Sequence, residues 1–114
     1  MAIVGIDEIV YGAGDIARCR RFMDEWGLEE VSADAAQLVY ETGNGGRVIV
    51  ADPAVVDLPP AIEEGPTLRS VTWGVAEPAD LVRLREVIAG EPDFFEADGR
   101  IGCRDPNGLA VRFQ

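Results

Sequence analysis

The first quarter of the chain changes from strand-like to helical periodicity. Residues 3–13 (IVGIDEIVYGA) alternate and are rich in Ile and Val, as in a strand. Asp15 suits a helix N-cap and Gly27 suits the residue after a helix C-terminus. Apolar residues between them recur at helical spacing, namely Ile16, Cys19, Met23 and Trp26. The pattern predicts a strand at 3–13 and a helix at 15–26.

Three shorter strands are predicted next, at 28–32, 37–42 and 47–51, the last one after the glycine-rich turn at 43–46. Residues 52–66 hold four of the seven prolines and are interpreted as a linker.

The second half repeats this order. Residues 68–76 alternate as a strand, and a helix is predicted from Pro78, which suits a first helical position, to a stop at Gly90. Three strands complete the chain, at 94–97, 100–104 and 109–113.

The two halves align with each other. DEIVYGAGD (7–15) matches RSVTWGVAE (69–77) at an offset of 62, and TGNGGRVIV (42–50) matches DPNGLAVRF (105–113) at 63. An alternative to a repeat is that the chain consists of two generic α+β halves that happen to share turn glycines. The register favours a tandem βαβββ repeat in a single domain over 1–114, with module one at 3–51, the linker at 52–66 and module two at 67–114.

The amino-acid composition excludes several classes of function. The chain has 114 residues, enough for one domain, and a net charge of −11; its ten basic residues are all arginine, with no lysine or histidine. Nucleic acid and anionic membranes are disfavoured as partners, and Schiff-base, Ser-His-Asp and imidazole–metal chemistry are excluded. We expect a cytoplasmic protein for three reasons. The two cysteines, Cys19 and Cys103, are far apart in the sequence, no signal peptide is visible, and no apolar run approaches the length of about 20 residues that spans a membrane.

The repeat and its ending resemble the glyoxalase / bleomycin-resistance / dioxygenase superfamily, also called vicinal oxygen chelate. The residues that carry the resemblance are IDEIVYGAGD with its helix and WGL, the segment TLRSVTWGVAEPADLVRLREVI, and the closing RDPNGLAVRF, which is similar to the family's Asp-Pro-x-Gly-Asn-x-x-Glu ending. The resemblance implies an α+β fold: an open, curved, eight-stranded mixed sheet that cups a ligand, with the helices on the outer face.

The resemblance also implies metal-ligand positions, usually His, His and Glu. In this chain they fall on Glu8, Ser70 and Arg112, with Ile49 as the module-one counterpart of Arg112. One carboxylate beside a permanent cation does not hold a divalent metal ion. We therefore expect none of the family's usual Fe, Mn, Zn or Ni, no other cofactor and no catalytic residue in this chain.

Strand alternation predicts what lines the cup instead. Ile9, Tyr11 and the apolar positions of the later strands should pack under the helices, which leaves polar residues on the concave side. The candidate ligand-binding residues there are Glu8, Arg47, Ser70, Thr72 and Arg112.

The roles of these side chains are open. We hypothesise that Glu8 and Arg112 form an ion pair in the vacated metal site. Alternatively, Glu8 is a solvated carboxylate, and Arg112 is structural or binds a ligand carboxylate or phenolate in bidentate fashion. Cys103 is interpreted as a small buried residue, although its arginine neighbour is able to lower a thiol pKa.

Three functions follow from the resemblance. The first is a metal-free, non-catalytic N-terminal domain of an extradiol-dioxygenase-like protein, whose ring-cleaving metal site lies outside this chain. The second is a stand-alone drug-sequestering protein of the bleomycin-resistance kind, whose acidic cup takes a small aromatic or cationic molecule. A metal-dependent lyase or isomerase is least favoured. A homodimer, or pairing with a second domain of the same type, is expected because an open sheet leaves strand edges to cover.

Overall fold

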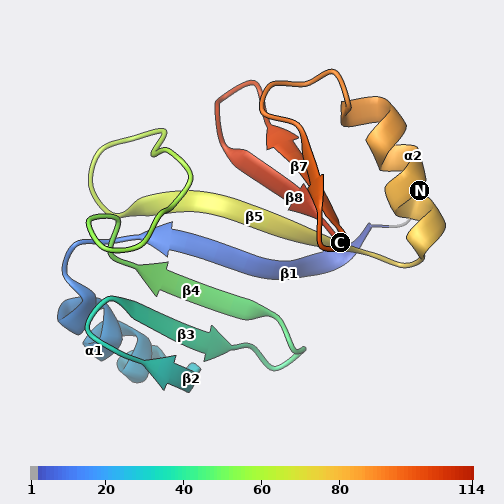
Figure 1. The fold of residues 1–114 in the computed structure, drawn as a ribbon. Helices are drawn as coiled ribbons and strands as arrows, with labels where there is room; N and C mark the ends of the chain where they lie inside the picture. Colours follow the sequence, from blue (N-terminus) through green and yellow to red (C-terminus); the bar gives the residue numbers. More distant parts are fainter. Residues whose placement is uncertain (1–2) are drawn as a thin grey trace.

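The computed structural model describes residues 3–114 as ten elements in the order βαβββ–βαβββ (Figure 1). The first half contains β1 (Ile3–Gly12), α1 (Ile16–Trp26), β2 (Glu29–Ala33), β3 (Gln37–Glu41) and β4 (Arg47–Ala51). The second half contains β5 (Thr67–Val75), α2 (Pro78–Ile88), β6 (Phe95–Ala97), β7 (Arg100–Arg104) and β8 (Ala110–Phe113). Every predicted helix and strand is present, with ends that differ by one or two residues.

The strands form one eight-stranded sheet in the order β2-β3-β4-β1-β5-β8-β7-β6. The first strand of each half pairs in parallel with the last strand of that half, β1 with β4 and β5 with β8. The two first strands pair antiparallel at the centre and join the halves. The predicted α+β class with an open, mixed, eight-stranded sheet is confirmed.

Each helix covers one half of the outer face. The side chain of Asp15 accepts a hydrogen bond from the Arg18 backbone N–H (3.0 Å) at the start of α1, and Gly27 ends the helix at φ 81°. The core under α1 is built around Leu38, Tyr40 and Val50. Trp26 was predicted on the buried stripe of this helix, but it is the last helical residue and is 73% exposed, stacked near Phe22.

At the start of the second helix, the Asp80 side chain accepts a hydrogen bond from the Glu77 backbone N–H (3.2 Å), and the Asp80 N–H donates to the Glu77 backbone carbonyl (3.0 Å). Its buried side packs on a core that contains Leu84, Ile88, Ile101 and Phe113, with Trp73, Val75 and Val111 at its margin. The predicted outward orientation of Trp73, Val75, Val111 and Phe113 is therefore confirmed. Neither helix in the described residues has the length and hydropathy needed to cross a membrane.

The central β1–β5 pair is irregular in places that matter for the concave face. Ile6 lies opposite Trp73 and Glu8 opposite Thr72, so Asp7 is an extra residue in β1. Val10 lies opposite Ser70 and Tyr11 opposite Leu68, so Arg69 is an extra residue in β5. A bulge of this kind allows two consecutive side chains to lie on the same side of a sheet.

The linker at 52–66 has no helix or strand and lies against the second half. The Arg69 guanidinium donates a hydrogen bond to the Pro59 carbonyl oxygen (2.9 Å). Pro59 and Pro60 also border a small hollow with Ala110 and Arg112. The linker therefore contributes to the wall of the cup as well as connecting the halves.

Candidate ligand-binding face

One row of directly paired residues crosses all eight strands and contains Glu8. Starting from β2 and ending at β6, the row is Glu29, Glu41, Arg47, Glu8, Thr72, Arg112, Gly102 and Phe95. Directly opposed residues in a sheet project on the same face. Arg47, Glu8, Thr72 and Arg112 thus share the concave face, and Ser70, two residues from Thr72, lies on the same face in the next row, between Val10 and Ala110.

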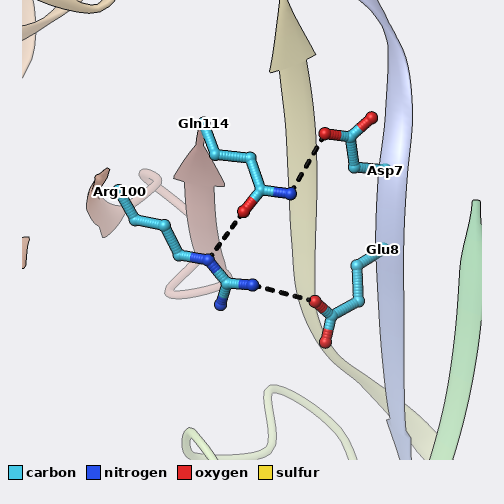
Figure 2. Close-up of polar contacts among 4 residues, drawn as sticks. All are labelled: Asp7, Glu8, Arg100 and Gln114. Carbon is cyan, nitrogen blue, oxygen red and sulfur yellow. Dashed lines mark hydrogen bonds and ion pairs between the residues drawn. The ribbon is translucent and has the colours of Figure 1, made fainter. Parts of the chain in front are cut away.

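A polar network connects the first strand with the end of the chain (Figure 2). The Arg100 guanidinium pairs with the Glu8 carboxylate (Nη2–Oε2 3.2 Å) and donates through Nε to Oε1 of Gln114 (2.8 Å). The Gln114 amide in turn donates to the Asp7 carboxylate (3.1 Å). The extra residue in β1 explains why both neighbouring carboxylates reach this network.

The ion pair expected between Glu8 and Arg112 is replaced by the pair of Glu8 with Arg100. Thr72 stands between Glu8 and Arg112 in the row, which separates their backbones by two strand spacings, about 10 Å. Arg100 lies three strands from β1 in the sheet order but still reaches Glu8, because the sheet curves and the side chain is long.

Arg112 has a different environment from Arg100. Its guanidinium carbon lies 5.8 Å from the centre of the Phe95 ring, and its Nε is buried without a hydrogen-bond partner. It belongs to none of the ion pairs formed by residues 3–114. Gly102, directly opposite Arg112, leaves room for the ring: a Cβ there would lie 2.5 Å from Cε1 of Phe95.

Arg112 borders an open hollow on the concave side. Its volume is about 590 Å³, and the residues around it are Phe95, Ala97, Asp98, Arg100, Arg112 and Gln114. This size falls within the range of small-molecule sites. A smaller hollow of about 160 Å³ lies on the other side of Phe95 and Arg112, toward the linker prolines.

The five candidate residues therefore differ in accessibility. Ser70 and Thr72 are each 1% exposed and border neither hollow. Arg47 is exposed on the other half of the sheet, and Glu8 is held by Arg100. Only Arg112 combines the concave position with a hollow that a ligand can enter.

Several residues of this face were missed by sequence reasoning. Along residues 100–104, side chains alternate between the two faces of the sheet. Ile101 and Cys103 face the core, so Arg100, Gly102 and Arg104 face the concave side, and the position of Arg100 could have been predicted from this alternation. The same alternation extends from Arg112 to Gln114. Asp7 was not predictable in this way, since its orientation depends on the bulge.

The residues at the implied metal-ligand positions do not fit a metal ion. Glu8 is paired with a guanidinium, Ser70 is buried, and Ile49 and Arg112 lack a donor lone pair for a metal. Within residues 3–114, no group of three or more His, Cys, Asp or Glu side chains is placed to hold a metal.

The surroundings of the two thiols disfavour the thiolate form. Burial raises the pKa of the Cys103 thiol, and the nearby Glu91 and Asp105 raise it further. Burial followed by Asp15 likewise raises the pKa of Cys19. Both cysteines pack at the edges of the two cores, which agrees with the interpretation of Cys103 as a packing residue.

Comparisons with known proteins bear on the fold. No protein-family model matches the sequence, and no curated protein sequence matches it significantly. A Mn(II)-bound glyoxalase from Novosphingobium aromaticivorans is similar in structure, with 18% identity, a TM-score of 0.67 and a match over 98% of this chain and 38% of that chain. An extradiol ring-cleaving dioxygenase from B. fuscum shows 14% identity and a TM-score of 0.70, over 98% and 32%.

A methylmalonyl-CoA epimerase from Streptomyces coelicolor shows 16% identity and a TM-score of 0.60, over 98% of this chain and 96% of that chain. The chain thus spans about a third of the length of the glyoxalase and the dioxygenase, and nearly all of the epimerase. At these identities the likeness establishes the fold. The chain has the fold of the glyoxalase / bleomycin-resistance / dioxygenase, or vicinal oxygen chelate, superfamily.

Proposed function

We propose that this chain is a metal-free domain without catalytic residues of its own, of the kind that forms the N-terminal part of extradiol-dioxygenase-like proteins. The observation that carries the proposal is the pairing of Glu8 with Arg100. Glu8 is the one carboxylate at the implied metal-ligand positions, and here its charge is already balanced by a cation. The similarity to about a third of a ring-cleaving dioxygenase supports the same role.

In this role the ring-cleaving chemistry belongs to a second domain of the same fold. That domain would supply the two histidines and the glutamate that this chain lacks. The test is the reading frame beyond Gln114: we expect a second pair of βαβββ modules that carries this ligand set. A stop codon immediately after Gln114 would contradict the two-domain proposal.

The metal-free state is tested separately, on the purified protein. After anaerobic incubation with Fe(II), Mn(II), Zn(II) or Ni(II) and removal of free metal, elemental analysis should find far less than one equivalent of each. The Glu8→Gln variant should give the same result, because Glu8 is not a ligand. Stoichiometric metal in the wild-type protein that is lost in Glu8→Gln would overturn the proposal.

The drug-sequestering alternative predicted an acidic cup. The second half of the concave face instead contains Arg100 and Arg112 around its larger hollow. A cationic ligand there would be repelled by Arg112, which has no carboxylate partner among residues 3–114, so the charge at this position does not favour that alternative.

A further inference from the structure

We propose that the hollow beside Arg112 binds a small organic monocarboxylate. This goes beyond the metal-free role, because it assigns a ligand class to a surface that contains no metal ligands. The site consists of Arg112 as the anion-binding group and Phe95 as an apolar wall, and Arg100 and Gln114 also line it.

The charge balance of the arginines points to an anion at Arg112. Arg100 is paired with Glu8 and Arg104 with Asp93, while Arg69 donates to the Pro59 carbonyl and does not border the larger hollow. Arg112 is half-buried and has no carboxylate partner in the described chain. A guanidinium taken partly out of water is stabilised by an anion that replaces the lost hydration.

The residues around Arg112 favour a small organic carboxylate over other anions. A carboxylate matches the planar fork of a guanidinium in bidentate fashion. The Phe95 ring beside it offers apolar surface for the rest of the ligand. Asp98 borders the same hollow, and the chain carries a net charge of −11, so a singly charged ligand is repelled less than a dianion such as phosphate.

The test is a titration of the whole chain, freed of metal with EDTA that is then dialysed away, with three probes that share one ring: benzoate, benzamide and benzylamine. Inorganic phosphate is a fourth probe. Binding is followed by calorimetry and by the NMR shifts of the arginine Nε–H groups. We expect saturable binding of benzoate that shifts the Arg112 signal, and binding at least about tenfold weaker for the other three probes.

Two variants separate the site from general charge. Arg112→Gln should weaken benzoate binding at least about tenfold, whereas Arg21→Gln, which removes the same charge from the exposed face of α1, should leave it within about twofold. Thermal unfolding checks that both variants are folded. Arg112→Lys, which keeps the charge without the planar fork, should bind with intermediate affinity.

Several outcomes would overturn the proposal: no saturable benzoate binding, equal losses in Arg112→Gln and Arg21→Gln, or phosphate or benzylamine bound as tightly as benzoate. Failure here is distinguishable from failure of the metal-free proposal. Benzoate binding is measured on protein from which metal and EDTA have been removed, so it does not depend on metal content, and metal content is measured without benzoate.

Discussion

The two halves of the sheet place different side chains at equivalent positions of the concave face. In the first half, consecutive partners across β2, β3, β4 and β1 are Ser32, Val39, Ile49 and Val10. In the second half, the same pairing across β6, β7, β8 and β5 joins Phe95, Gly102, Arg112 and Thr72. Backbone pairing is the same in both rows, but one row is mainly apolar and the other contains an arginine next to an aromatic ring.

The difference shows how a cation is accommodated on the second half. Val39 fills the position that Gly102 leaves open, and the Phe95 ring occupies the space above the glycine, within reach of Arg112. An arginine at this position thus comes with two matching changes on the neighbouring strands. The first half lacks both, so it should not accept an arginine at the equivalent position, Ile49.

The largest expected effect concerns whether the halves fold together. Leu38→Ala removes a fully buried side chain from the first core and should lower the free energy of unfolding by about 3 kcal/mol. In a Trp26→Phe background, Trp73 reports on the second half, and its urea transition should shift as well, because β1 pairs along β5. The exposed-site control Val82→Ala should change stability by less than about 0.5 kcal/mol. An unshifted Trp73 transition would mean that the halves unfold independently.

Exchanging the residue types at Ile49 and Arg112, the equivalent positions of the two halves, tests whether the two rows differ in what they accept. Ile49→Arg should cost about 2 kcal/mol, since it places an unpaired charge between Val10 and Val39. Arg112→Ile should stay within about 1 kcal/mol of the wild type, because it removes a charge without a carboxylate partner. Urea unfolding measures both. Equal costs for the two exchanges would show that the two rows are interchangeable.

Gly102→Ala tests the space that the ring occupies. The added Cβ would lie 2.5 Å from the Phe95 ring and 2.8 Å from the Val111 carbonyl oxygen, so the strand or the ring must move, at a cost of about 1–2 kcal/mol. Gly90→Ala is the control, since a Cβ there meets no atom within 4 Å. Thermal unfolding compares the two variants, and a Gly102→Ala protein as stable as Gly90→Ala would contradict the steric argument.

The smallest expected effect at neutral pH lies in the first core. The Tyr40 hydroxyl is buried without a partner, and burial, then Asp24 and Glu30, raise its pKa. The protonated phenol is thus favoured by folding, and this stabilisation is complete below the unfolded pKa of about 10 and lost as the pH rises through the folded pKa.

Tyr40→Phe should therefore gain up to about 1 kcal/mol at pH 7 and show a smaller loss of stability above pH 10. Unfolding curves across this pH range measure the effect. Tyr11→Phe, at an exposed ring, should keep the alkaline loss of the wild type. If Tyr40→Phe loses as much stability above pH 10 as the wild type does, the alkaline loss of stability belongs to another group.

The fold was predictable because its signals are local and repeated. The helix at α1 follows from the spacing between Asp15 and Gly27, and the aligned segments 42–50 and 105–113 placed the closing strands of both halves in one scheme. The outer and concave faces of β5 and β8 then followed from simple alternation. These features depend on backbone period, which a sequence records directly.

The site was less predictable because its contacts depend on sheet curvature and on the linker. Glu8 was correctly placed on the concave face, but its partner, Arg100, comes from a strand three positions away. Ser70 and Thr72 face the expected side but are buried, in a half of the cup that the linker prolines border. No pairwise spacing in the sequence records these distances.

The bulge at Asp7 means that the two ends of β1 alternate in different phases. Ile6 lies opposite Trp73, at the second core, and Ile9 lies opposite Val48, at the first. Three residues apart on a regular strand, the two isoleucines would point to opposite faces. The extra residue brings both to the outer face, so deleting Asp7 would remove more than a carboxylate: it would turn one end of the strand over and point one of the two isoleucines into the cup.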